Sequence, residues 1–140
     1  MRVSFADTLY WIAMTYRHDN YHEMAAQVSR RLGQCRLLTS ELVLGEYLTG
    51  MSKHGQYWRE QAALRVDGLL RDPNVDVEPQ SREGFKAALE LYRRRLDKEY
   101  SFVDCDGMVL MNRQGIREVL THDHHFEQEG FTILLKQSAA

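Results

Sequence analysis

Near the N-terminus, Val3-Ser4-Phe5-Ala6-Asp7 is a short apolar run that closes on an acid. A run of this length and composition is typical of a buried strand in a parallel sheet. The next segment, residues 8–14, is apolar nearly all round and predicts a buried helix. We therefore expect the first strand to end at Asp7, with its carboxylate at the carboxyl end of the sheet, where open α/β sheets bind their ligands.

Strands and helices alternate along the rest of the chain. Further strands are expected over residues 36–38, 75–77, 119–120 and 132–135. Helices are expected over residues 21–33, 42–51, 56–70, 81–96 and 101–114, several of them with a capping residue or a terminal glycine. This order predicts a single α/β domain over residues 1–140, with a central, mostly parallel sheet between two helical layers, a three-layer α/β/α fold.

Composition limits the classes of protein to consider. The chain has 140 residues, of which 44% are hydrophobic, enough for one compact domain with a core. Cys35 and Cys105 form neither a CxxC motif nor a disulfide framework, which favours a reducing, cytoplasmic setting. No export signal or membrane-spanning run is visible. Because the net charge is −2, any nucleic-acid binding must come from local basic patches.

Four acids are the candidate catalytic and metal-binding residues: Asp7, Glu46, Asp104 and Asp123. Asp7 and Asp123 follow strands, although such an Asp can simply cap the next helix. Glu46 stands among apolar helix neighbours, where burial would require a counter-charge; an exposed Glu is the alternative. Asp104 falls in Ser101-x-x-Asp104, which also fits a capping box. Together the acids predict a site for Mg²⁺ or Mn²⁺, and hence phosphodiester hydrolysis.

Residues next to these acids are candidates for supporting roles. Asp106 lies two residues from Asp104, on the opposite side of a helix, so we expect only one of them to bind the ion and Asp106 to act from the rim. His122, His124 and His125 flank Asp123, but their spacing fits no zinc motif, and they are interpreted mainly as loop residues.

A basic cluster precedes Asp104 in the sequence. Its members, the candidate contacts to an RNA backbone, are Arg93, Arg94, Arg95 and Lys98. A solvated helix face is the plainer interpretation of such a run.

Several short motifs occur in an order and spacing that resemble the PIN-domain family across the whole chain. They are Asp7-Thr8, Thr39-Ser40 followed by Gly45-Glu46, Tyr100-Ser101-Phe102-Val103-Asp104, and Thr121-x-Asp123-x-His125-Phe126 with Gly130-Phe131. The stretch 95–100 resembles the VapC-type branch of the family.

The resemblance implies a PIN-like fold and a Mg²⁺- or Mn²⁺-dependent ribonuclease with the four acids as its cluster. It also implies supporting positions for Thr8 and Thr121, and marks Asp106 as a departure from the family pattern. VapC-type proteins are toxins held by a small antitoxin, and they commonly form homodimers. Candidate residues for an apolar antitoxin groove, with core packing as the alternative, are Leu9, Tyr10, Trp11, Tyr47, Tyr57 and Trp58.

The sequence leaves two other functions open. One is a PIN-like module that binds RNA or protein without cutting it. The other is metal-dependent hydrolysis of DNA or of a smaller phosphate ester, because the same ions serve all these reactions.

Overall fold

The computed structural model describes residues 1–137, so residues 138–140 of the expected domain lie outside the described part. The strands are β1 (Val3–Ala6), β2 (Arg36–Ser40), β3 (Val75–Glu78), β4 (Glu118–Leu120) and β5 (Thr132–Ile133). The helices are α1 (Thr8–Thr15), α2 (His22–Leu32), α3 (Glu41–Ser52), α4 (Gln56–Arg71), α5 (Arg82–Arg94), α6 (Phe102–Gln114) and α7 (His124–Gln128).

The strands form one five-stranded sheet in the order β3-β2-β1-β4-β5, and every pairing is parallel. The expected parallel sheet is thus confirmed. β1 occupies the centre, where Phe5 pairs with Leu38 on one side and Val119 on the other. Phe5 and Ala6 are fully buried, as expected for a strand that is covered on both faces. Asp7, directly after this strand, therefore emerges at the middle of the sheet's carboxyl edge.

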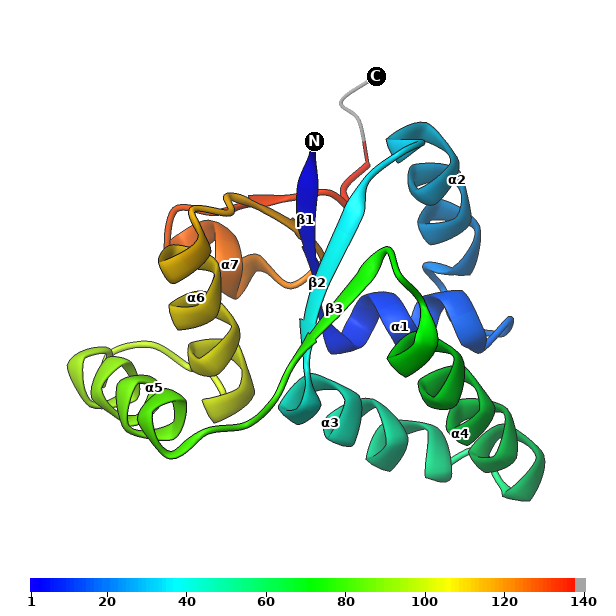
Figure 1. Cartoon of the computed structure of the whole chain (residues 1–140), viewed down its shortest axis with the longest axis horizontal. Coiled ribbons are helices and arrows are strands. Elements are labelled where there is room, and N and C mark those ends of the chain that lie inside the picture. The colour runs from blue at the N-terminus through cyan, green and yellow to red at the C-terminus, as the bar shows by residue number, and fades with distance from the viewer. Residues whose placement is uncertain (138–140) are drawn as a thin grey trace.

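Helices cover both faces of the sheet (Figure 1). Helices α1, α2 and α4 lie on one side, α5, α6 and α7 lie on the other, and α3 follows the end of β2 and contacts both α4 and α6. This arrangement confirms the three-layer α/β/α architecture. Within residues 1–137, no helix combines the length and the apolar character needed to cross a bilayer.

A glycine brings α6 close to the central strand. A Cβ on Gly107 would lie 3.0 Å from Cε1 of Phe5, closer than side chains normally approach. The missing side chain lets α6 pack directly on β1. The N-terminal turn of α6, which carries Asp104, is thereby held near the end of that strand.

The main differences from the expected elements are three. β2 continues through Thr39 and Ser40, because both pair with β3, while Ser40 still caps α3 by accepting a hydrogen bond from the Val43 N–H. β5 has two residues instead of four. Helix α7 is absent from the sequence-based expectation, since five residues are too few for a periodic pattern to emerge.

Candidate metal centre

Asp7 lies buried at the end of β1, with 3% of its surface exposed. It is the N-cap residue of α1, yet its side chain makes no capping hydrogen bond. Oδ2 instead accepts a hydrogen bond from the Thr121 hydroxyl at 3.0 Å, from the loop after β4. The capping alternative therefore does not explain why an acid stands here.

Burial raises the pKa of Asp7 to about 7, and the negative charges of Asp104 and Glu46 add to the rise. Hydrogen bonds from the Thr8 backbone and the Thr121 side chain lower this pKa and offset only part of the effect. A carboxyl group in this environment is costly to ionise, because water is excluded and the nearby charges have the same sign. A bound cation would reverse both penalties.

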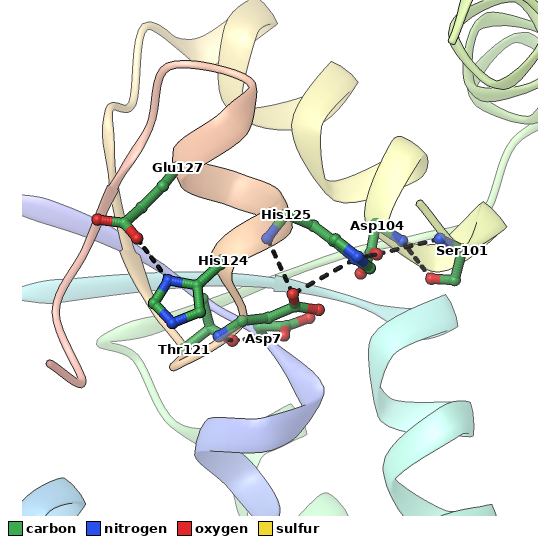
Figure 2. Close-up of polar contacts among 8 residues, drawn as sticks. Asp7, Ser101, Asp104, Thr121, His124, His125 and Glu127 are labelled. Carbon is green, nitrogen blue, oxygen red and sulfur yellow. Dashed lines mark hydrogen bonds and ion pairs between the residues drawn. The ribbon is translucent and has the colours of Figure 1, made fainter. Parts of the chain in front are cut away.

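Asp104 begins α6 and has two roles at once. Its side chain accepts a hydrogen bond from the Ser101 N–H at 3.0 Å, and the Ser101 hydroxyl accepts one from the Asp104 N–H, so the capping box is present. The same Oδ2 lies 3.1 Å from Nδ1 of His125 (Figure 2). Burial raises the pKa of Asp104, while the Ser101 backbone and His125 lower it. Capping and membership of an acidic cluster are therefore compatible.

Asp123 and His125 complete a three-residue cluster with Asp104. Oδ1 of Asp123 accepts a hydrogen bond from the His125 N–H at 2.9 Å, which starts α7, and lies 3.3 Å from the His125 Nδ1 atom. One ligand atom from each of the three residues lies within 4.8 Å of the other two. Two carboxylates and an imidazole form a donor set that suits a divalent cation.

Glu46 is exposed on α3, so the expectation of a buried glutamate among apolar neighbours is wrong. Its apolar neighbours along the helix, Val43, Leu44 and Tyr47, face the core, while Glu46 points to solvent. Its negative charge still contributes to the raised pKa of Asp7, so Glu46 lies near that acid. Four acids from β1, α3, α6 and the β4–α7 loop thus surround one edge of the sheet.

Comparison with known proteins agrees with this geometry. The family model for the PIN domain matches residues 4–131. The chain belongs to the PIN-domain family. It is also 29% identical over 130 residues to the 23S rRNA-specific endonuclease VapC20 of Mycobacterium tuberculosis, covering 91% of this chain and 94% of that protein. A VapC ribonuclease of Aquifex aeolicus is 33% identical over 99 residues, covering 69% of this chain and 67% of the relative.

Two solved structures show the same fold. The crystal structure of M. tuberculosis VapC20, described as a Sarcin-Ricin loop cleaving toxin, has a TM-score of 0.82 at 29% identity and covers 93% of this chain and 96% of that one. The structure of FitAcB from Neisseria gonorrhoeae has a TM-score of 0.63 at 14% identity and covers 94% and 96%. The latter likeness concerns the fold alone.

The two threonines expected to support this PIN-domain cluster differ in their contacts. Thr121 bonds to Asp7, and its hydroxyl also accepts a hydrogen bond from the Asp123 N–H at 3.1 Å. The Thr8 hydroxyl is buried, and no hydrogen-bond partner for it is found among residues 1–137. A buried hydroxyl without a partner, next to Asp7 in the chain, is consistent with a site in which polar groups bind a ligand.

Asp106 lies on another side of α6 from Asp104. It lines a small separate hollow together with Ser40, Glu78 and Arg113. Burial raises its pKa, and the positive charge of Arg113 lowers it. These neighbours differ from those of the acid cluster, and a supporting role for Asp106 stays a prediction.

The interpretation of the sequence misses His125 as a site residue, because it treats all three histidines mainly as loop residues. Only its place two residues after Asp123 distinguished it, and that spacing alone does not show which imidazole turns toward Asp104. Figure 2 shows that His124 turns toward Glu127 instead. Its Nδ1 atom lies 2.6 Å from Oε1 of Glu127. The choice between the two rings depends on how α7 docks beside α6.

Several members of the basic cluster form ion pairs within the chain. Arg95 donates from Nε and Nη2 to the two carboxylate oxygens of Glu129, both at 2.9 Å, and Tyr100 donates its hydroxyl to the same acid. Arg93 pairs with Glu90 at 2.7 Å, and Lys98 lies 4.0 Å from the acid before it. RNA contacts by the four members of the basic cluster, Arg93, Arg94, Arg95 and Lys98, stay predictions. Among these four, the exposed Arg94 makes no ion pair with residues 1–137.

The candidate groove residues separate into core and surface. Tyr10, Trp11 and Tyr47 are buried in the core, so packing is their role and the groove assignment for them is wrong. Leu9 and Trp58 are half-buried, and Tyr57 is exposed on α4. These three remain candidates for contact with a partner.

Proposed function

We propose that the chain is a Mg²⁺- or Mn²⁺-dependent endoribonuclease that acts as the toxin of a toxin–antitoxin pair. One observation carries the proposal: Asp104, Asp123 and His125 converge beside the buried Asp7, whose pKa is raised to about 7, in a PIN domain. The presence of all four acids weighs against a module that binds without cutting. Relatives named as ribonucleases favour RNA over DNA or a small ester as the substrate.

The residues present suit a hard divalent cation. Asp7, Asp104 and Asp123 would supply carboxylate oxygens, and Glu46 would act from the open side of the site. Such an ion, when bound, polarises a phosphodiester and lowers the pKa of a water molecule so that it can attack phosphorus. This chemistry needs no nucleophile from a side chain.

The protein's own part is to position these groups. Thr121 fixes the orientation of Asp7 and the backbone before Asp123 through one hydroxyl. His125 places Nδ1 3.1 Å from Oδ2 of Asp104 and 3.3 Å from Oδ1 of Asp123, so its ring holds these two carboxylates beside each other. The Ser101 cap fixes the Asp104 carboxylate at the start of α6. Each acid is thereby pre-oriented before substrate arrives.

The name of the VapC20 relative supplies the first substrate to try, the Sarcin-Ricin loop of 23S rRNA. The test incubates that RNA hairpin with wild-type protein and with Asp104→Asn, in Mg²⁺, in Mn²⁺ and in EDTA. We expect the wild type to give one discrete cut that requires metal, and the variant to give none. Equal cutting by the two proteins, or cutting in EDTA, would refute the metal-dependent assignment.

Partner and location follow from the toxin proposal. A toxin that acts on RNA must be held inactive until needed, so we expect a cognate antitoxin. We also expect the chain to act in the cytoplasm and to form a homodimer, which is the unit that the antitoxin binds. Co-expression with the product of a short neighbouring reading frame should suppress growth arrest. Light scattering on the purified chain measures the oligomeric state, and a monomer at micromolar concentration would contradict the dimer.

A further inference from the structure

A second hollow is bordered by His122 and His124, the two residues that flank Asp123 in the chain. Its volume is about 560 Å³, in the range of roughly 300–1,000 Å³ that holds small ligands. Its polar and aromatic lining includes Asn20, Tyr21, His122, His124, Lys136 and Gln137. None of them has a role in the proposed metal centre.

One wall is an aromatic pair. The rings of Tyr21 and His122 are stacked, with centroids 3.7 Å apart and planes 6° from parallel. The Tyr21 backbone N–H donates to the Asp19 carboxylate at 2.8 Å, which fixes the turn before α2. The pair joins two segments that are distant in sequence, the α1–α2 turn and the β4–α7 loop. Each ring covers one face of the other, and an outer face of such a pre-ordered pair suits a nucleobase.

His124 and Lys136, which also line the hollow, are joined by hydrogen bonds to Glu127. Glu127 accepts from Lys136 Nζ at 2.8 Å through Oε2 and lies 2.6 Å from Nδ1 of His124 through Oε1. The carboxylate of Glu127 is thus offset by its two partners, and Asp19 is engaged with the backbone of Tyr21. Lys136 remains more than half exposed and can attract a phosphate. The amides of Asn20 and Gln137 each offer a donor and an acceptor.

The hollow is adjacent to the place of chemistry. His122 and His124 are the two chain neighbours of Asp123, and consecutive Cα atoms are about 3.8 Å apart. The nucleotide next to a phosphate held at Asp123 can therefore reach the Tyr21–His122 pair.

We propose that this hollow is a nucleotide subsite, which takes one RNA base next to the cleaved bond against the Tyr21–His122 pair and reads its edge with Asn20 and Gln137. The proposal deepens the endoribonuclease function and rests on it for the position of the cut. Stacking supplies affinity, and the two amides supply selection among bases.

The test uses a short single-stranded RNA that carries one 2-aminopurine, a base whose fluorescence falls when it stacks on an aromatic ring. Titrations in EDTA measure binding without cleavage. We expect quenching with the wild type and with Tyr21→Phe. For Tyr21→Ala we expect loss of the quenching and roughly tenfold weaker binding, the usual effect of losing one stacked base. Tyr57→Ala, at an exposed tyrosine on α4, is the matched control for RNA binding, and its quenching and RNA affinity should equal those of the wild type.

Three results would overturn the subsite: no quenching by the wild type, unchanged quenching with Tyr21→Ala, or equal losses with Tyr21→Ala and Tyr21→Phe. Unchanged quenching with Tyr21→Ala, together with weaker binding of this variant to the antitoxin, would assign the hollow to a protein partner. Asp7→Asn separates this inference from the proposed function, since it should quench like the wild type without cutting. A wild type that quenches as expected but never cuts RNA would reject the nuclease and leave an RNA-binding hollow.

Discussion

The Thr121 hydroxyl donates a hydrogen bond to Oδ2 of Asp7 over 3.0 Å, and this contact joins the ends of the central strand β1 and its neighbour β4. Both side chains are buried. The Thr121 oxygen also accepts the Asp123 N–H, so one hydroxyl uses its donor for one acid and its lone pair for the backbone of another. The orientation of two candidate metal ligands therefore depends on a single side chain that is not itself an acid.

Replacing Thr121 by Val should impair cleavage with little change in core volume. The Asp7 carboxylate loses its donor, its pKa rises further, and the Asp123 N–H loses its acceptor. Changes to residues that orient metal ligands typically cost about 10- to 100-fold in metal affinity or activity. The pH profile of cleavage should also shift to higher pH. Thr121→Ser keeps the hydroxyl and should retain the wild-type profile; a Val variant that matches it would show that the hydrogen bond has no role.

Without metal, Asp7 should make stability fall as pH rises. Its pKa is about 7 in the folded chain and near 3.8 in the unfolded chain, so between these values the folded state binds the extra proton and unfolding becomes easier with increasing pH. The loss amounts to a few kcal/mol, because each tenfold change in proton affinity corresponds to about 1.4 kcal/mol. Melting curves in EDTA from pH 5 to pH 8 measure it. Asp7→Asn should flatten this decline and melt higher than wild type at pH 8; parallel curves would contradict the assignment.

Metal should reverse this instability. A cation that binds the folded chain stabilises it by about 2.7 kcal/mol when its free concentration is a hundred times the dissociation constant. Millimolar Mg²⁺ or Mn²⁺ should therefore raise the melting temperature of the wild type, and Asp104→Asn should weaken the response. Glu41→Gln is the matched control, because Glu41 bonds to the Gln80 N–H, outside the cluster. An indifferent wild type, or an equal response from Asp104→Asn, would count against a metal held here.

Arg94 and Arg95 should separate RNA binding from stability. Arg95 is held by Glu129 in a two-bond pair, so Arg95→Ala should lower the melting temperature by a small amount. Arg94→Ala should leave the melting temperature unchanged and weaken RNA binding. The slope of the logarithm of RNA affinity against the logarithm of salt concentration should fall by about one. Filter binding at several salt concentrations measures the second effect. Identical RNA affinity for wild type and Arg94→Ala would remove Arg94 from the RNA surface.

The fold was predictable from the sequence because its strands are short, mostly buried and separated by helices with an apolar face. The misplaced boundaries depend on long-range pairing: Ser40 is strand as well as helix cap only because Glu78 lies beside it. Sequence also indicated the four acids, since strand ends and helix starts share one edge of a parallel sheet. It could not show that Glu46 faces solvent, because the apolar stripe of a helix does not decide whether a residue at its edge is buried or exposed. Nor could it select His125, whose position depends on the docking of a five-residue helix.

The most direct test is a crystal structure of the chain soaked in Mn²⁺, with anomalous scattering used to locate the ion. We predict a peak within coordinating distance, about 2.0–2.3 Å, of carboxylate oxygens from Asp7, Asp104 and Asp123. A peak that lies elsewhere while these carboxylates keep their metal-free contacts, or no peak in a crystal whose protein cuts RNA in Mn²⁺, would contradict a metal centre formed by these acids.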